Sequence, residues 1–391
     1  MSNPLGFGLS SLPARRAAGY PSTPGLPASR LGIVPSSPVT DAIADRLDHF
    51  LQSIRSRGAE YGPDAELFLG AAAATLQGGK RLRARFAHAG WLAAGGDGTA
   101  PDAALWGLGA ALEVFQSAAL VHDDLIDNSD TRRGRPASHR ALEAAHRDAG
   151  WHGDAEAFGR SAAVLLGDLL VAWSDDLLEE SLRGHPHAAA TRAEYARMRR
   201  DVTVGQMLDI TEESAWSVNP PSSLLERALR VAALKSARYS VEQPILLGAT
   251  LAGADDSLLE GLRAFGHPVG MAFQLRDDVL GVFGDPTVTG KPAGDDLREG
   301  KRTALIAIAR DALDDDARRH LDARIGDPDL SAAEVAQLQE LIRESGAAEQ
   351  VERMIAAYTE SAARALDAAA LNTRAAQTLN ELATAAIARS A

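Results

Sequence analysis

The feature that most constrains the fold is a helical spacing of apolar residues that continues through most of the chain. From about Asp41 onward, Ala, Leu, Arg, Asp and Glu dominate, and runs of β-branched residues are scarce. Apolar residues recur three and four positions apart, as in the stripe of Ile43, Leu47, Phe50, Leu51 and Ile54. The same spacing predicts helices over 102–127, 158–181, 189–215, 223–252, 256–282, 302–324 and 331–389. We therefore expect one all-α domain over residues 41–391.

The first forty residues have a different composition. They hold seven of the 18 prolines, three arginines and no acidic residue, and they show no sustained apolar period. This composition predicts a disordered Pro/Gly/Ser-rich extension over residues 1–40. An Arg-containing, acid-free segment also fits an organellar transit peptide, although no amphipathic helix supports that alternative.

Bulk composition excludes several classes of protein. The net charge is -13, whereas nucleic-acid binders usually carry a basic footprint, so we expect no nucleic-acid partner. The chain has no Cys, which excludes disulfides and thiolate metal sites and favours a cytoplasmic location. No run of about 18 apolar residues occurs, so we expect no transmembrane segment.

An apolar stretch, FQSAALVHDDLID, ends in three carboxylates. On a helix, Asp123 and Asp127 share a face, Asp124 lies beside them, and Gln116 lies two turns earlier on that face. Carboxylates that converge at a helix end suit Mg²⁺, which takes few protein ligands and accepts substrate phosphates. The alternative is a solvated acidic face.

Arginines follow this cluster closely. Arg132, Arg133 and Arg135 lie within eight residues of Asp127. Their guanidinium groups suit bidentate binding of phosphate oxygens. Acids for a metal next to arginines for phosphate predict a metal–diphosphate site, unless the arginines pair locally with Asp127 and Asp130.

A second acidic cluster comes about 150 residues later in the sequence. One helical stripe is formed by Gln274, Asp277, Asp278 and Gly281. A Gly/Pro-rich stretch with Lys291 and Lys301 follows it, which predicts a loop that closes over a substrate, or an ordinary solvated loop.

The basic stretch GGKRLR carries Lys80 and Arg83, which share a face if a helix begins near Gly79. A phosphate at that helix start would meet free backbone N–H groups and the positive end of the dipole. The alternatives are a solvated basic turn or a nucleic-acid patch.

These stretches together resemble the trans-isoprenyl diphosphate synthases, the polyprenyl synthetase family, over residues 42–389. The matching motifs are GGKRLR, QSAALVHDDLIDNSDTRRGRPASH, GDLLVAW, VGQMLD, KSARYS and FQLRDDVLGVFGDPTVTGKPAGDDLREGKRT. The resemblance implies an isoprenoid synthase type I helical bundle with a central cavity, usually a homodimer. It also implies the head-to-tail condensation of isopentenyl diphosphate with an allylic diphosphate.

Site residues follow from the same resemblance. It makes catalytic metal ligands of Asp123, Asp124, Asp127, Asp277 and Asp278, which would hold about three Mg²⁺. The allylic diphosphate would be held by Arg132, Lys235, Ser236, Gln206, Gln274, Lys291 and Lys301, with Lys235 also catalytic. Isopentenyl diphosphate would be held by Lys80, Arg83, Gln116 and Arg133. One departure is Gly281 in place of a final Asp, for which Asp285 could compensate.

Product length depends on the helix before Asp123, where bulky residues stop chain growth in this family. Ala118 and Ala119 are small, and the next candidate is Phe115, displaced by three residues or about 4.5 Å. This predicts geranylgeranyl diphosphate (C₂₀). A Phe115 that packed sideways into another helix would give a longer product.

Several other functions stay open. The alternatives are a farnesyl or longer-chain (C₂₅ and above) synthase, a class I terpene cyclase, and a non-catalytic partner subunit. A cyclase needs only one diphosphate site, whereas GGKRLR and the Arg132–Arg133 pair indicate two. Partner subunits typically lose aspartates of the first cluster, and this chain keeps all three.

Overall fold

The computed structural model describes residues 37–62, 65–96, 103–132, 134–285 and 294–388. Its first half contains α1 (Pro38–Arg57), η1 (Gly58–Tyr61), α2 (Ala65–Thr75), α3 (Leu82–Ala93), α4 (Ala103–Ile126), β1 (Thr131–Arg132), β2 (Arg135–Pro136), α5 (Ser138–Asp148), α6 (Ala155–Ser181) and α7 (Ala188–Ala215). Next come η2 (Pro221–Ser223), α8 (Leu224–Val231), the π-helix η3 (Ala232–Glu242), α9 (Gln243–Leu251) and α10 (Asp256–Phe283). The last are α12 (Asp295–Glu299), α13 (Ala304–Ala312), α14 (Asp315–Arg324), α15 (Ala332–Glu344), α16 (Ala347–Ala368) and α17 (Thr373–Ile387).

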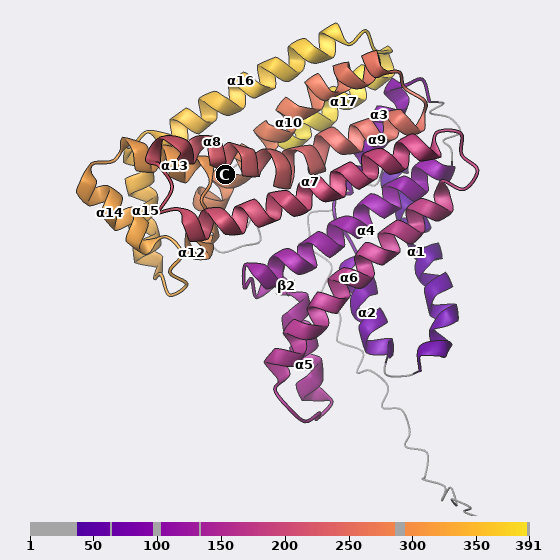
Figure 1. The fold of residues 1–391 in the computed structure, drawn as a ribbon, viewed down its shortest axis with the longest axis horizontal. Coiled ribbons are helices and arrows are strands. Elements are labelled where there is room, and N and C mark those ends of the chain that lie inside the picture. Colours follow the sequence, from indigo (N-terminus) through magenta and orange to yellow (C-terminus); the bar gives the residue numbers. More distant parts are fainter. Residues whose placement is uncertain (1–36, 63–64, 97–102, 133, 286–293, 389–391) are drawn as a thin grey trace, which may run out of the picture. The chain divides into compact units, whose positions relative to one another are not determined.

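The predicted all-α fold is confirmed. Within the described residues the only strands are β1 and β2, which pair antiparallel with Thr131 opposite Pro136. The described residues belong to one compact unit. Figure 1 shows α10 running beside α16, with η3 packed on α10 and α6 beside α4.

The first helix begins earlier than composition predicted. Residues 38–40, which we placed in the extension, form the start of α1. Ser37 caps this helix: its hydroxyl accepts from the Thr40 N–H at 3.2 Å, and the Thr40 hydroxyl accepts from the Ser37 N–H at 2.8 Å. Because Pro38 follows the cap with its φ already restricted, the helix can start at a proline.

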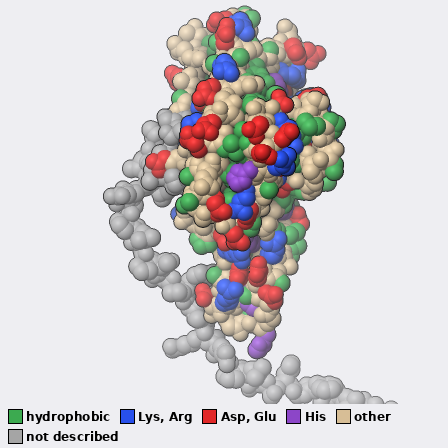
Figure 2. Space-filling model, turned by 90° about the vertical axis from the view of Figure 1, so that its left-hand side faces the viewer, with side chains coloured by type: hydrophobic (Ala, Val, Ile, Leu, Met, Phe, Trp, Pro, Cys, Tyr) green, Lys and Arg blue, Asp and Glu red, His purple; other side chains and the backbone are tan. Residues whose placement is uncertain are grey.

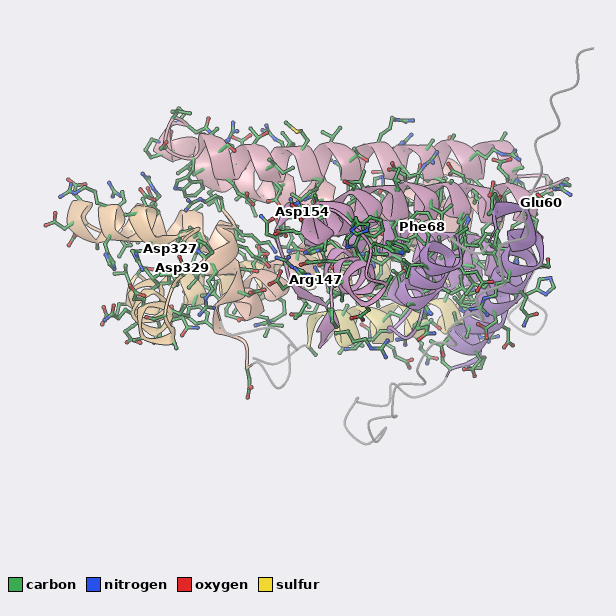
Figure 3. All side chains as sticks on the ribbon, turned by 90° about the horizontal axis from the view of Figure 1, so that it is seen from below. Glu60, Phe68, Arg147, Asp154, Asp327 and Asp329 are labelled. Carbon is green, nitrogen blue, oxygen red and sulfur yellow. The ribbon has the colours of Figure 1, made fainter. Side chains whose placement is uncertain are left out.

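Other differences also come from local chain geometry. The single segment predicted over 331–389 is three helices, α15, α16 and α17, because Gly346 adopts φ 75° and Asn372 caps α17. Likewise Asp314 caps α14 and separates it from α13. Asp154 caps α6 in the same way, accepting from the N–H groups of residues 156 and 157 (Figure 3). Short polar caps interrupt an apolar period without changing it, so periodicity alone missed these breaks.

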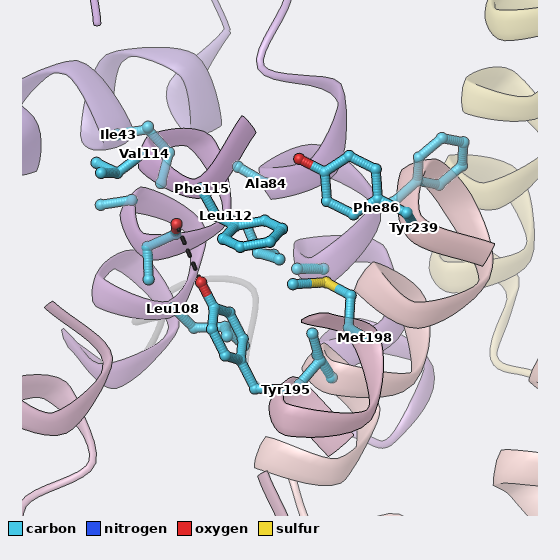
Figure 4. Close-up of a cluster of buried hydrophobic side chains, with 14 of the residues drawn as sticks. Ile43, Ala84, Phe86, Leu108, Leu112, Val114, Phe115, Tyr195, Met198 and Tyr239 are labelled. Carbon is cyan, nitrogen blue, oxygen red and sulfur yellow. Dashed lines mark hydrogen bonds between the residues drawn. The ribbon is translucent and has the colours of Figure 1, made fainter. Parts of the chain in front are cut away.

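The core surrounds α4. This helix packs against α6, α3 and α1, and its buried residues include Leu108, Leu112 and Phe115 (Figure 4). By length and composition α4 is the one described helix that could span a membrane, but 78% of its apolar window is buried within the fold. That is the burial of a core helix. The surface, in contrast, intermingles acidic and basic side chains (Figure 2).

The π-helix η3 is held close to α7 by a glycine. A Cβ atom on Gly205 would lie 2.4 Å from the backbone N of Lys235. No side chain fits there, so Gly205 allows the two backbones to approach and brings Lys235 toward the ends of α4 and α7. Long π-helical stretches are rare and often mark functional sites.

We expect Gly205→Ala to destabilise the protein by about 1–3 kcal/mol, because the added methyl group overpacks the α7–η3 contact. Gly70→Ala, in α2, is the matched control because nothing lies within 4 Å of its added Cβ. Alanine has the higher helix propensity, so this control should be neutral or stabilising. Thermal unfolding of both variants measures the difference. Equal melting temperatures for the two variants would contradict the close-approach interpretation.

Candidate active site

The first acidic cluster lies at the C-terminal end of α4, where an arginine from the β1–β2 hairpin pairs with two of its acids. Arg132 donates from Nε to Asp124 Oδ1 at 2.7 Å, a second nitrogen donates to the same oxygen, and Asp123 lies 3.6 Å away. Arg132 therefore contacts the two adjacent acids, not Asp127 or Asp130. Predicted site residue Arg133 lies outside the described residues.

Lys235 connects this cluster to α7. Its ammonium donates to Asp209 Oδ2 at 2.6 Å and lies 3.1 Å from Asp123 Oδ1. Burial alone would lower the pKa of Lys235, but these two carboxylates raise it above its usual value. Burial would likewise raise the pKa of Asp123, but Lys235, Lys301 and Arg132 together hold it below its usual value.

Lys301 connects the first cluster to α12. Its ammonium lies 2.6 Å from Glu299 Oε2, 3.4 Å from Asp127 Oδ2 and 3.6 Å from Asp296 Oδ1. These carboxylates raise its pKa well above the usual value although burial opposes them. The end of the predicted loop thus reaches across to α4. Its other lysine, Lys291, lies outside the described residues.

The second cluster lies on α10. Gln274 donates from Nε2 to Asp278 Oδ1 at 2.7 Å, while Asp277 is exposed. Burial raises the pKa of Asp278 to about 8, and the nearby carboxylates of Asp296, Asp277 and Asp209 add to the effect. Asp296 of α12 links the two clusters, because it lies against α10 at Gly281 and 3.6 Å from Lys301, which in turn lies 3.4 Å from Asp127.

Asp296 fills the space beside Gly281. A Cβ atom at position 281 would lie 1.8 Å from Asp296 Oδ2. The carboxylate of α12 therefore lies against α10 where a final Asp of the motif would project. Asp285, which we considered as the compensating acid, is exposed beyond the end of α10.

The centre carries more acid than the described cations balance. Burial and the carboxylate of Asp123 raise the pKa of Asp127 to about 6, and burial and Asp209 raise the pKa of Glu213 to about 7. Oδ1 of Asp123 and Oδ2 of Asp127 are buried, at 3.1 Å from the Lys235 ammonium and 3.4 Å from the Lys301 ammonium. In the part of the chain that is described, no three acidic or histidine side chains form a ready-made metal cage. Mg²⁺ takes only one or two carboxylates with water and substrate phosphates, so this donor set fits it.

The predicted isopentenyl diphosphate residues are linked through Tyr239 on η3. Arg83 donates to Ser240 Oγ at 2.7 Å and lies over the Tyr239 ring, 4.1 Å from its centroid. The Tyr239 hydroxyl donates to Gln116 Oε1 at 2.7 Å. Two of the four residues that the resemblance assigned to this site are therefore adjacent.

The condition under which Lys80 and Arg83 would share a helical face, a helix that begins near Gly79, is not met. α3 begins at Leu82, and Arg81 before it adopts φ 48°. Arg81 is held there by donation to the Leu76 carbonyl and an ion pair of 3.7 Å with Glu113. Lys80 consequently precedes the helix, exposed to solvent, and shares no helical face with Arg83.

The remaining candidates lie along the same helices. Gln206 on α7 is half-buried with Nε2 lacking a hydrogen-bond partner, and Ser236 is half-buried on η3. Phe115 and Ala118 are buried, at 6% and 1% exposure, and Ala119 is half-buried.

Sequence reasoning missed five residues of this centre: Asp209, Glu213, Tyr239, Asp296 and Glu299. A signal existed for two of them, because Gln206, Asp209 and Glu213 recur at helical spacing on one face of α7. Asp296 and Glu299 could not be found from helical spacing, because α12 has only five residues.

Two surface hollows lie elsewhere. One, of about 260 Å³, lies between α10, α16 and α17, and the other, of about 480 Å³, between α1 and residues 73–81. No aspartate of either cluster lines them. The lysine bridges cross the space between the acid-bearing helices instead.

An all-α fold with acid clusters on α4 and α10, in which lysines join the α4 acids to carboxylates of α7 and α12, is typical of a diphosphate-handling enzyme. The Polyprenyl synthetase family profile matches residues 66–342, and the chain belongs to that family. It is therefore an enzyme of the prenyl diphosphate synthase class.

Individual relatives agree in class and differ in product. Geranylfarnesyl diphosphate synthase of Aeropyrum pernix is 31% identical over 81% of this chain and 90% of its own length. Geranylgeranyl diphosphate synthase of Mycobacterium tuberculosis is 31% identical over 74% and 75%. A crystal structure of geranylgeranyl pyrophosphate synthase from Corynebacterium glutamicum, complexed with isoprenyl diphosphate and magnesium, superposes with a TM-score of 0.84 at 40% identity, covering 90% and 98%.

We expect Gly281→Ala to displace the Asp296 carboxylate, lower kcat and raise the Mg²⁺ concentration needed for half-maximal rate several-fold. Gly261→Ala is the control on the same helix, because its Cβ would meet Ala369 at an ordinary 3.5 Å. Steady-state kinetics over a Mg²⁺ titration, with melting temperatures measured without metal, test the pair. Wild-type Mg²⁺ dependence in Gly281→Ala would show that the fit of Asp296 against α10 does not matter.

Proposed function

We propose that the protein condenses isopentenyl diphosphate with an allylic diphosphate in the trans, head-to-tail sense and releases geranylgeranyl diphosphate (C₂₀). The observation that supports this most is the single centre formed by Asp123, Asp127, Asp278, Lys235 and Lys301 from four different elements. Arg83 and Gln116 both contact Tyr239 of η3, and we propose that a second diphosphate binds beside them.

The protein's own cations hold the allylic diphosphate in this proposal. Lys235, Lys301 and Arg132 each contact at least two carboxylates and can exchange one of these for phosphate oxygens. Gln206, three residues before Asp209 on α7, has a buried amide nitrogen without a hydrogen-bond partner, and we propose it as a further donor to the diphosphate. As the allylic C–O bond breaks, negative charge grows on the leaving diphosphate, and these fixed donors stabilise it.

The aspartates are the proposed Mg²⁺ holders, with about three ions per site by family resemblance. When bound, Mg²⁺ supplies positive charge to the leaving diphosphate. The cationic carbon is attacked by the double bond of isopentenyl diphosphate, and the released diphosphate accepts the proton. The apolar wall of α4 excludes the water that would otherwise quench the cation.

Phe115 sets the proposed product length. Its ring is edge-on to Tyr239 at 5.7 Å and to Tyr195 at 6.3 Å, so it points from α4 toward η3 and α7. The same two elements, η3 and α7, carry Lys235 and Asp209 on the side of the aspartates. The growing chain would therefore meet Phe115 after passing Ala118 and Ala119.

We also propose a cytoplasmic homodimer. Val164 and Leu165 on α6 are 45% and 60% exposed, and Ile126 at the end of the adjacent α4 is 41% exposed. An exposed apolar face on these two packed helices suits a second copy of the chain.

Wild-type protein should convert isopentenyl diphosphate and a dimethylallyl, geranyl or farnesyl primer to C₂₀ product in Mg²⁺, and EDTA should abolish turnover. Asp277→Ala and Asp278→Ala should each lower the rate by at least tenfold, because both remove carboxylates from the metal site. Mass spectrometry of the products gives the readout. Near-normal rates in both variants would exclude the second cluster as a metal site. Cyclised hydrocarbon from the primer alone would favour a terpene cyclase instead.

We expect Ala118→Phe to shorten the main product to C₁₅, because a ring at position 118 would block the growing chain closer to the metal site. We expect Phe115→Ala to lengthen the product, because it removes the ring that blocks the chain. Ala110→Val, on the same helix farther from the aspartates, controls for general disturbance of α4. Chromatography of the dephosphorylated products measures both. An unchanged product in both variants would show that α4 does not limit the chain.

A further inference from the structure

Tyr195 lies directly beyond Phe115, on the side away from the aspartates. Along α7, Tyr195 precedes Asp209 by fourteen residues, or about 21 Å of helix. Along α4, Phe115 precedes Asp123 by eight residues, or about 12 Å. The two rings meet edge-on with centroids 6.3 Å apart. A chain that grew past Phe115 would therefore reach Tyr195 next (Figure 4).

Hydrogen bonds fix the Tyr195 ring between three helices. Its side chain is 1% exposed, and its hydroxyl donates to the Ala111 carbonyl on α4 at 3.3 Å. Because the single hydroxyl proton is used there, Ser174 on α6 donates to the same oxygen. In the helical pattern, the Ala111 carbonyl is the one that accepts the N–H of Phe115. Tyr195 is thus attached to α4 one turn below Phe115.

Phe115 has no comparable anchor. It is apolar and is held by ring contacts with Tyr195 and Tyr239. Rotating Tyr195 away would leave buried hydroxyl groups of Tyr195 and Ser174 without partners, which is costly in an apolar environment. Of the two rings, Tyr195 is the one that the surrounding structure holds in place.

We propose that Tyr195 is a second, fixed barrier that determines the maximum product length once Phe115 is passed. Ala111 lies four residues before Phe115, about 6 Å farther along the helix, which is about one more isoprene unit. This inference rests on the proposed function and on Phe115 as the first barrier. It requires that loss of Phe115 alone lengthens the product by one unit, to C₂₅, and no farther.

The test compares four proteins with farnesyl diphosphate, excess isopentenyl diphosphate and Mg²⁺: wild type, Phe115→Ala, Tyr195→Leu and the double variant. Wild type and Tyr195→Leu should both end at C₂₀, because Phe115 still stops the chain. Phe115→Ala should end at C₂₅. The double variant should give mainly C₃₀ and longer products, with the KM for isopentenyl diphosphate within about twofold of that of Phe115→Ala, since the change is far from the diphosphates.

A milder series covers the case in which Tyr195→Leu does not fold. Tyr195→Phe and Ser174→Ala keep the ring at position 195 and remove one or both of its anchors. In the Phe115→Ala background, each should raise the C₃₀ fraction at least tenfold, because the loosened ring can turn aside. Tyr358→Phe is the matched control, because Tyr358 lies on α16, half-buried against a different apolar cluster from that of Tyr195. This change should leave the C₂₅ end point unchanged.

Several outcomes would overturn the proposal. Phe115→Ala alone could already give C₃₀, the double variant could end at C₂₅, or the anchor variants could give no additional C₃₀. Lengthening by Tyr195→Leu alone would also reject the order of the two barriers. In each of these cases wild type still makes a prenyl diphosphate, so only the inference fails. A wild type that makes none from any primer would reject the proposed function itself.

Discussion

The structure depends on the balance of charge at one buried centre. Carboxylates from α4, α7, α10 and α12 converge there, and two unit charges about 4 Å apart interact by about 4 kcal/mol at an effective dielectric constant near 20. Without cations the four elements would repel one another. Lys235 joins α4 to α7, and Lys301 joins α4 to α12. Burial, together with neighbouring carboxylates, nevertheless raises the pKa values of Asp127, Glu213 and Asp278.

This incomplete neutralisation suits an enzyme that must take up and release highly charged substrates. A fully paired centre would be stable and inert, because a diphosphate would then have to displace well-matched partners. Here each bridging lysine contacts more than one acid, so exchange of one contact for a phosphate oxygen leaves another in place. In the proposed function, the same groups stabilise the protein before binding and hold the leaving group afterwards.

Backbone packing positions these charges. The close approach of η3 and α7 at Gly205 brings Lys235 between Asp123 and Asp209, and Gly281 leaves room for Asp296 against α10. Farther from the charged centre, the same elements present two rings to Phe115 of α4: Tyr239 from η3 and Tyr195 from α7. One set of helices thus has a charged end, where we propose that the diphosphates bind, and an apolar end, where we propose that the prenyl chain lies.

The sequence by itself determined the all-α fold and the two acid clusters, because helical periodicity and carboxylate spacing are local properties of the chain. It also indicated that Arg83 and Gln116 belong to one site. Only the tertiary structure decided which cation meets which acid, that Asp296 lies beside Gly281, and that Tyr195 lies beyond Phe115. Many of these contacts join residues that are far apart in the sequence: 15 positions for Asp296 and Gly281, 84 for Tyr195 and Ala111, and 174 for Lys301 and Asp127. No spacing rule reports them, because they depend on how helices pack rather than on the period of any one helix.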